Sequence, residues 1–177
     1  MTRHPNDRAD RIRLESLWSA HYDAVFAFAR RRTDETRAAE VAAEVFTVAW
    51  RRLDDVPAAP LGWLLGVARR TIANDRRGAR RRLALFERLS DHRVDPLLHS
   101  DGHSDILIAL ATLGANDRDA LLLVAWEGLT SDEAATAMGC SRTTFNVRIH
   151  RARQRLRRAL DRAIPETTAP PTAEEAR

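Results

Sequence analysis

The sequence predicts an all-α protein made of two small helical domains joined by a flexible linker. Apolar residues recur at spacings of three and four along most of the chain, as they do on one face of an α-helix. Runs of Val, Ile, Thr and Tyr that are typical of strands are absent. Aromatic residues make up only 6% of the 177 residues, so the core is expected to consist mainly of Ala, Leu and Val.

The first half of the chain is expected to contain three helices in a domain that spans residues 12–82. Residues 1–11 are polar and are expected to be loose. Amphipathic patterns then predict helices over residues 13–31, 35–53 and from about 61 through the basic segment that follows. A capped turn at residues 33–35 and a proline-containing loop at residues 53–62 separate them. Trp18, Trp50 and Trp126 are expected to lie in the core.

The second half is expected to contain four helices in a domain that spans residues 105–163. Residues 83–104 have weak periodicity and are predicted to be a linker, although residues 83–89 could continue the preceding helix. The helices are expected over residues 105–113, 116–129, 130–139 and 142–163. The expected end signals are Asn116 as an N-cap, Thr130 with Glu133 as a capping box, Gly139 as a left-handed stop and Ser141 as the last cap. The Pro/Thr-rich tail, residues 164–177, is predicted to be disordered.

Positive charge is concentrated in two segments of the chain. All 29 basic residues are arginine, a choice that biased base composition explains, yet arginine also makes forked contacts to phosphate and guanine. Residues 69–82 contain seven arginines and one aspartate, and residues 142–158 contain seven arginines and no acidic residue. The two segments hold thirteen excess positive charges, so the rest of the chain has a net charge of −9 against the total of +4. Two basic segments in an acidic background predict two separate contacts with a polyanion.

The segment from residue 130 to residue 160 has the pattern of a helix-turn-helix. Ala134, Ala135 and Met138 are expected to pack inward from its first helix, and Gly139 turns the chain. On the second helix Phe145, Ile149, Ala152 and Leu156 form one apolar stripe, which leaves the opposite face free for base edges and phosphates. The residues expected to contact duplex DNA are Arg142, Thr143, Asn146, Val147, Arg148, Arg151, Arg155 and Arg158. A solvated amphipathic helix is the alternative interpretation.

The other basic segment follows a proline loop and Trp63. This arrangement suits the binding of single-stranded DNA. Arginines on one helical face can follow a backbone while unstacked bases meet an aromatic ring or a small loop pocket. For Trp63 itself, packing in the core is the favoured interpretation over a role as a stacking platform. On the preceding helix Glu40 and Glu44 form an acidic strip that is either a protein contact or an ordinary soluble face.

The two segments together resemble the extracytoplasmic-function sigma factors of bacterial RNA polymerase over roughly residues 13–160. The segment "AEVAAEVFTVAWRRLDDVPAAPLGWLLGVARRTIANDRRGARRR" is similar to region 2 of that family. The segment "ATLGANDRDALLLVAWEGLTSDEAATAMGCSRTTFNVRIHRARQRLRRAL" is similar to region 4. The resemblance implies a promoter-specificity subunit that binds core polymerase and promoter DNA, catalyses no reaction and can be held by an anti-sigma factor.

The resemblance also assigns roles to individual residues. It implies that the −35 element is read by Arg142, Thr143, Asn146, Val147, Arg148 and Arg151. Reading of the −10 element falls on the loop 54–61, which includes Asp54 and Asp55, and on Arg70, Asn74 and Arg77, with Trp63 and Arg81 beside them. Contact with core polymerase falls on Glu40, Glu44, Trp50, Arg51 and Arg52. Arg70 and the pair Asn146–Val147 depart from the usual family residues, which leaves the promoter sequence open.

Two other functions remain compatible with the residues. A stand-alone helix-turn-helix regulator that dimerises through its N-terminal helices would bind duplex DNA tightly without polymerase. A helical protein-binding module, polymerase-binding or anti-sigma-like, would use its arginines on acidic surfaces and would show no preference among DNA sequences. The second basic segment, behind a proline loop and Trp63, disfavours both because neither function requires it.

Catalysis, metal binding and secretion are not expected. The chain has no Gly-rich phosphate loop and no evident nucleophile, so no enzyme activity and no cofactor are predicted. His92, His99 and His103 alternate with aspartates at irregular spacing, which disfavours a metal site. The single cysteine, Cys140, excludes an internal disulfide and is expected to be structural. No secretory signal or membrane span is apparent, and we expect a cytoplasmic protein.

Overall fold

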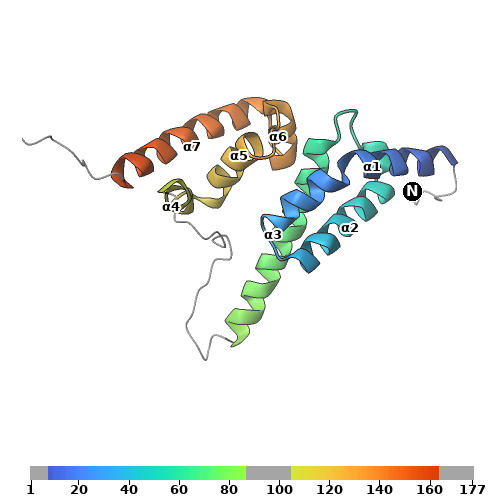
Figure 1. The fold of residues 1–177 in the computed structure, drawn as a ribbon, viewed down its shortest axis with the longest axis horizontal. Coiled ribbons are helices and arrows are strands. Elements are labelled where there is room, and N and C mark those ends of the chain that lie inside the picture. The colour runs from blue at the N-terminus through green and yellow to red at the C-terminus, as the bar shows by residue number, and fades with distance from the viewer. Residues whose placement is uncertain (1–7, 87–104, 164–177) are drawn as a thin grey trace, which may run out of the picture.

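The computed structural model describes residues 8–86 and 105–163, which form helices and no strand, so the all-α prediction is confirmed (Figure 1). The first half contains α1 (Arg8–Arg30), α2 (Glu35–Arg51), a 3₁₀ turn η1 (Leu53–Asp55) and α3 (Leu61–Phe86). The second half contains α4 (Asp105–Ala111), α5 (Ala115–Ala125), α6 (Ser131–Met138) and α7 (Arg142–Ala163). The predicted linker beyond Phe86 and the tail 164–177 lie outside the described residues.

Two helix boundaries in the first half differ from those expected, and a third follows the longer of the two expected alternatives. Helix α1 begins at Arg8 instead of Arg13, because residues 8–12 contain no Gly or Pro and Asp10 stands in the first turn, where an acidic side chain is favourable. Helix α2 ends at Arg51, because the chain tightens into η1, where the amide of Asp55 donates to the carbonyl of Arg52 at 2.9 Å. Helix α3 continues to Phe86, as the apolar residues after 82 allowed.

Three of the four end signals predicted for the second half are confirmed, and two helices end earlier than expected, α4 at Ala111 and α5 at Ala125. Thr130 and Glu133 form a capping box, Gly139 has a φ of +66°, and the hydroxyl of Ser141 accepts from the amide of Thr144 at 3.2 Å. The prediction of Asn116 as an N-cap is wrong. Helix α5 begins directly after Gly114, and the Asn116 side chain accepts a hydrogen bond from Arg69 instead.

The core is built from aliphatic residues and phenylalanines of both halves. Among its fully buried side chains are Phe28, Val41 and Leu64 in the first half and Leu123 and Phe145 in the second. The buried side chains of the two halves belong to one continuous cluster. This continuity arises where α6 packs against the N-terminal part of α3, as Figure 1 shows.

The prediction that three tryptophans lie in the core is wrong for two of them. Trp126 is 57% exposed, because it follows the end of α5 at a position that faces away from the buried side of that helix. Trp18 is 42% exposed and stacks on Tyr22 at 4.7 Å and against Phe46 at 4.6 Å, as part of an aromatic cluster between α1 and α2. Trp50 is half-buried.

Candidate nucleic-acid interface

Helices α6 and α7 form a helix-turn-helix whose packing fixes the free face of α7. Ala134, Ala135 and Ala137 are buried on α6, and their small size lets α6 pack closely against its neighbours. Beyond the left-handed Gly139, the amide of Cys140 donates to the carbonyl of Ala135 at 3.0 Å, which closes the end of α6. Phe145, fully buried, then anchors the start of α7.

The apolar stripe predicted for α7 is buried as expected. Ile149 and Ala152 continue inward from Phe145, and Leu156 packs against the same core while remaining partly accessible. Helices α4 and α5 cover this side of α7. The N-terminal half of α7 therefore presents its opposite face to solvent.

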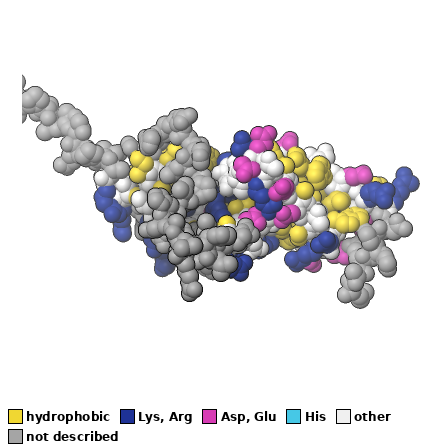
Figure 2. Space-filling model, turned by 90° about the horizontal axis from the view of Figure 1, so that it is seen from below, with side chains coloured by type: hydrophobic (Ala, Val, Ile, Leu, Met, Phe, Trp, Pro, Cys, Tyr) yellow, Lys and Arg dark blue, Asp and Glu magenta, His cyan; other side chains and the backbone are white. Residues whose placement is uncertain are grey.

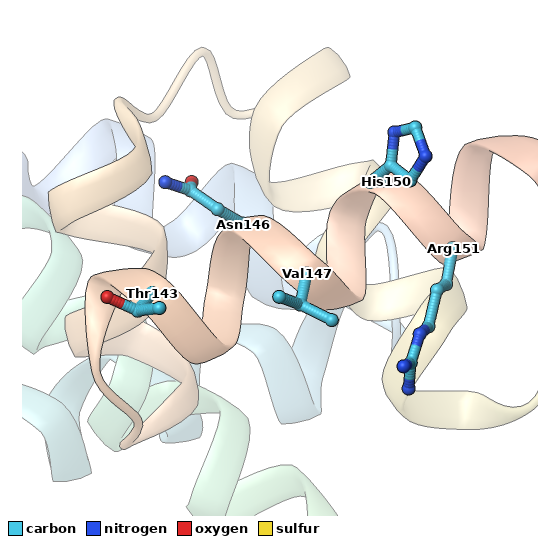
Figure 3. Close-up of a pocket in the computed structure, with 5 residues that line it drawn as sticks. All are labelled: Thr143, Asn146, Val147, His150 and Arg151. Carbon is cyan, nitrogen blue, oxygen red and sulfur yellow. The ribbon is translucent and has the colours of Figure 1, made fainter.

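That exposed face contains a shallow open hollow lined by residues from two turns of α7 (Figure 3). The lining residues are Thr143, Asn146, Val147, His150 and Arg151. Val147 is 47% exposed, which is unusual for an aliphatic side chain in a helix with an available core face. A second hollow beside it adds Asp117, Thr144, Arg148 and Arg155. A hydrogen-bonding amide, a methyl-bearing Val and arginines on one face match the groups that read base edges in a major groove.

His150 is a member of this face that the sequence prediction missed. It lies three and four residues after Val147 and Asn146 and seven after Thr143, so helical spacing alone could have identified it. In the structure its imidazole shares a 3.0 Å hydrogen bond with the Gln154 side chain. The pair extends the polar surface of α7 by one turn.

We call the exposed face of α7 the recognition face. Two of its arginines have carboxylate partners within the chain. Arg142 lies 3.1 Å from Asp132, and Arg155 pairs with Asp117. Both arginine side chains remain more than half exposed, and such pairs contribute little to stability. The two ion pairs hold the guanidinium groups near the recognition face. Each arginine can exchange its carboxylate partner for a phosphate. Arginine side chains are prominent at the α7 end of the molecule in Figure 2.

The basic part of α3 presents a second polar face. Asn74, Arg77 and Arg81 are exposed, and Arg77 donates a hydrogen bond to Asn74. Partial burial, and then the nearby charges of Arg52 and Arg69, lower the pKa of Arg70 from its ordinary value. A crowded arginine of this kind gains more from an incoming phosphate than an isolated one does.

Trp63 lies in the first turn of α3, directly after the η1 loop. Trp63 is half-buried and packs against the core, as its core interpretation predicted. The guanidinium of Arg52 lies 6.0 Å from its ring centroid and also donates to Asp55 at 2.8 Å. Arg52 therefore joins the η1 loop and Trp63 into one corner, beside the exposed Asp54.

The acidic strip of α2 is organised around Arg37. The guanidinium of Arg37 donates to Glu40 at 2.8 Å, to Glu44 at 2.9 Å and, across to α3, to Asp75 at 2.6 Å. The hydrogen bond to Glu40 is the main reason that the pKa of Arg37 is raised, with Asp75 and Glu44 adding to it against partial desolvation. Figure 2 shows acidic side chains interspersed with basic ones over the middle of the molecule.

The structure thus separates the residues assigned to polymerase contact into two groups. Glu40 and Glu44 lie around Arg37 in the acidic strip. Trp50 is half-buried and Arg51 is exposed at the C-terminal end of α2, and Arg52 follows in the η1 corner. Within residues 8–86 and 105–163, no group of His, Cys, Asp and Glu could hold a metal ion and no helix could cross a membrane. The linker histidines lie outside these residues.

The second half of the chain holds a helix-turn-helix with an exposed basic face, and the first half holds a second basic helix. These two features define a DNA-binding transcription factor of the two-domain helical class. Residues 17–82 match the family model "Sigma-70 region 2", and residues 104–156 match the model "Sigma-70, region 4". The chain belongs to the sigma-70 family of RNA polymerase sigma factors, and the resemblance to the extracytoplasmic-function class is confirmed.

Two mycobacterial proteins are similar to the chain along most of its length. They are the "Probable RNA polymerase sigma-C factor" of Mycobacterium bovis (strain ATCC BAA-935 / AF2122/97) and the "ECF RNA polymerase sigma factor SigC" of Mycobacterium tuberculosis (strain CDC 1551 / Oshkosh). Each is 29% identical over 152 residues, which covers 81% of this chain and 80% of the relative.

Two solved structures share the fold. The sigma factor RpoE, crystallised with the anti-sigma factor NepR from Bartonella quintana, has a TM-score of 0.61 at 23% identity and covers 83% of this chain and 96% of its own. CnrH, in complex with the cytosolic domain of CnrY, has a TM-score of 0.57 at 26% identity and covers 84% and 88%.

Proposed function

We propose that this sigma factor directs core RNA polymerase to promoters by reading the −35 element with α7 and the −10 element with α3. The observation that carries the proposal is the exposed face of α7, where Thr143, Asn146, Val147, His150 and Arg151 line one hollow on a helix-turn-helix. A helix so placed fits the major groove, with its N-terminal residues at the base edges.

The residues of α7 divide by chemistry into base readers and phosphate contacts. Asn146 can pair with the N6 and N7 atoms of adenine, and Val147 offers methyl groups to thymine. Arg148, Arg151 and Arg155, together with Arg142 at the helix start, suit phosphates on either side of the groove. Each phosphate that they neutralise releases condensed counterions, so binding is expected to weaken as salt rises.

Helix α3 and the η1 loop suit the −10 element after the strands separate. Arg70, Arg77 and Arg81 can follow the backbone of one strand while Asn74 offers hydrogen bonds to bases. A base flipped from the stack would enter the corner formed by Asp54, Asp55 and Trp63. Its contacts there offset an unstacking cost of a few kcal/mol.

Core polymerase is the partner that brings both surfaces to the promoter. Glu40 and Glu44 on α2, with Trp50, Arg51 and Arg52 at its end, are the proposed contact. The domains are proposed to span residues 12–82 and 105–163, with residues 83–104 as linker and 164–177 as tail. The protein makes and breaks no covalent bond in this mechanism and acts in the cytoplasm.

An anti-sigma factor is a further proposed partner. RpoE and CnrH were each solved with a bound partner, and NepR is described as an anti-sigma factor. A partner of that kind would bind the helical surfaces of both halves.

Run-off transcription with purified core polymerase and fragmented genomic DNA tests the proposal. We expect transcripts that begin at discrete sites and share two upstream elements when the sigma factor is present. Transcription that begins no more selectively than with core polymerase alone would refute it. A stand-alone regulator would bind duplex DNA but would leave the start sites of core polymerase unselected.

A further inference from the structure

The short segment from Val56 to Pro60, which we call the proline segment, connects η1 to α3 beside the proposed −10 surface. It follows Asp54 and Asp55 directly. Residues 57–59 are exposed, and they make no backbone hydrogen bond to any other residue that the structure describes. Their order in the free protein therefore depends on how the two ends of the proline segment are held.

Both ends of the proline segment are fixed to the helical framework. At its end, the carbonyl of Pro60 accepts a hydrogen bond from the amide of Leu64 at 2.9 Å, in the first turn of α3. At its start, the Val56 side chain is only 6% exposed and belongs to the core, and the Val56 amide donates to the carbonyl of Leu53 at 3.3 Å. Pro57 and Pro60 restrict the backbone further, since each ring fixes φ at about −65°.

Arg13 of α1 supplies an additional tie to the start of the proline segment. Its guanidinium donates to the carbonyl oxygen of Val56 at 3.1 Å, across 43 residues of sequence. The bond forms where the chain between α2 and α3 passes the N-terminal part of α1 (Figure 1). A hydrogen bond from a charged guanidinium is stronger than one between neutral groups. Arg13 therefore orients the peptide bond between Val56 and Pro57, from which the exposed residues begin.

The place of Arg13 in the chain separates it from the residues already assigned to promoter binding. The match to the region 2 model begins at residue 17, so Arg13 precedes it. Helix α1 begins at Arg8, which puts Arg13 inside the helix instead of at its expected start. The neighbouring Leu14 and Leu17 pack into the core, so the backbone that carries Arg13 is fixed. The guanidinium thus reaches Val56 from a rigid helix.

We propose that Arg13 is a positioning residue that holds the proline segment ready to receive a flipped base of the −10 element. The inference rests on the proposed function, because it requires that a base is captured in the corner formed by Asp54, Asp55 and Trp63. A segment that is ordered before DNA binds loses less conformational freedom on binding, so the same contacts with the base give a higher affinity. Arg13 acts through the proline segment and needs no contact with DNA.

Binding of forked promoter DNA to the complete holoenzyme tests the proposal. The fork carries an unpaired non-template −10 strand, which is either intact or abasic at one −10 position at a time. The wild type should lose affinity when the captured base is removed. Arg13→Ala should bind the intact fork about 5–10-fold more weakly than the wild type, and should bind the fork that lacks the captured base equally well. An unchanged affinity for the intact fork, or an equal loss on both forks, would overturn the proposal.

Two further variants separate positioning from a general effect of charge. Arg11→Ala is the matched control, because Arg11 is an exposed arginine two residues earlier on α1 and its replacement removes the same charge. It should bind both forks as the wild type does, and a loss equal to that of Arg13→Ala would overturn the proposal. Arg13→Lys keeps a cationic donor and should recover most of the affinity for the intact fork.

The salt dependence distinguishes positioning from direct contact with a phosphate. The slope of log affinity against log salt should be the same for the wild type and for Arg13→Ala. Loss of a phosphate contact would instead make that slope shallower by about 1. A shallower slope for Arg13→Ala would therefore overturn the positioning role.

A double-variant cycle shows whether Arg13 acts through the proline segment. Pro57→Gly frees the backbone directly after Val56, so it should weaken binding to the intact fork by a similar factor. Arg13→Ala combined with Pro57→Gly should weaken binding little further than either change alone, because both release the same segment. Losses that multiply would refute the role of Arg13 alone. A wild type that loses affinity at no abasic position would refute base capture in this corner, and with it the proposed reading of the −10 element.

Discussion

Arginine has several different roles in this protein, and the surroundings of each side chain determine its role. Arg37 holds three carboxylates across two helices, and Arg32 is buried against Phe28 and Glu127. Burial lowers the pKa of Arg32, and the charge of Glu127 opposes that shift. Arg148 and Arg151, by contrast, line open hollows on α7. The same side chain is therefore structural in one place and available to DNA in another.

The contribution of Arg37 to stability is testable by replacement with alanine. The Arg37→Ala variant loses charge-assisted hydrogen bonds to Glu40, Glu44 and Asp75, so we expect the free energy of unfolding to fall by about 1–3 kcal/mol. Urea denaturation measures it. Arg30→Ala is the control, because its pair with Glu35 is exposed at 3.6 Å and should contribute less than about 0.5 kcal/mol. Equal losses in the two variants would contradict the structural role of Arg37.

Phosphate contact by Arg151 has a distinct thermodynamic signature. For the full chain on a duplex that carries the −35 element, Arg151→Ala should weaken binding about equally for all sequences. The slope of log affinity against log salt should become shallower by about 1, the contribution of one phosphate. Fluorescence anisotropy at several salt concentrations measures both. A loss confined to one base pair, with an unchanged slope, would show that Arg151 reads a base instead.

At the scale of elements, both ends of α6 are set by local signals that are visible in the sequence. Gly139 supplies the left-handed residue that ends α6, and Thr130 with Glu133 begins it. Gly62 and Gly66, near the start of α3, are the opposite case. Glycine in a helix interior costs about 1 kcal/mol of stability relative to alanine. The packing of α3 within its own half does not explain them, and the close approach of α6 does.

The capping box predicts a measurable loss when it is removed. Thr130→Ala deletes the hydroxyl that accepts from the Glu133 amide at 3.3 Å, so the free energy of unfolding should fall by about 1 kcal/mol. Thermal denaturation followed by circular dichroism is the measurement. Thr136→Ala, in the exposed middle of α6, removes only a hydroxyl bonded to the carbonyl of Asp132 and should be close to neutral. A Thr130→Ala protein as stable as the wild type would argue against the cap.

These elements also mark how far the sequence alone could lead. The apolar stripe of Phe145, Ile149 and Ala152 was predictable because helical periodicity assigns a buried face whatever the partner is. The exposure of Trp18 and Trp126 was not, because it depends on which surfaces remain after the helices pack. Residues 142–151 of the recognition face followed from the stripe, and His150 was within reach of the same reasoning. The ion pairs of Arg37 with Asp75 and of Arg69 with Asp119 required the structure, since these partners are 38 and 50 residues away.

At the scale of the whole molecule, the proposed function depends on two basic faces carried by different helices of one chain. The face of α7 suits intact duplex and that of α3 suits separated strands, and the segment between them includes residues outside those described. The continuous core and the buried Glu127 show that the two halves also have a stable way of packing together.

The most direct test of the account is run-off transcription by core polymerase and this sigma factor on a promoter library randomised across the −35 element. If α7 reads that element, the wild type should select a defined sequence. Asn146→Ala should lose discrimination at one base pair, by about 1–3 kcal/mol, while the other positions and the start site stay unchanged. Gly114→Ala is the control, because a Cβ at that position meets no atom within 4 Å, and it should select the same sequence as the wild type. An Asn146→Ala enzyme with the full wild-type preference at every position of the element would contradict the central claim.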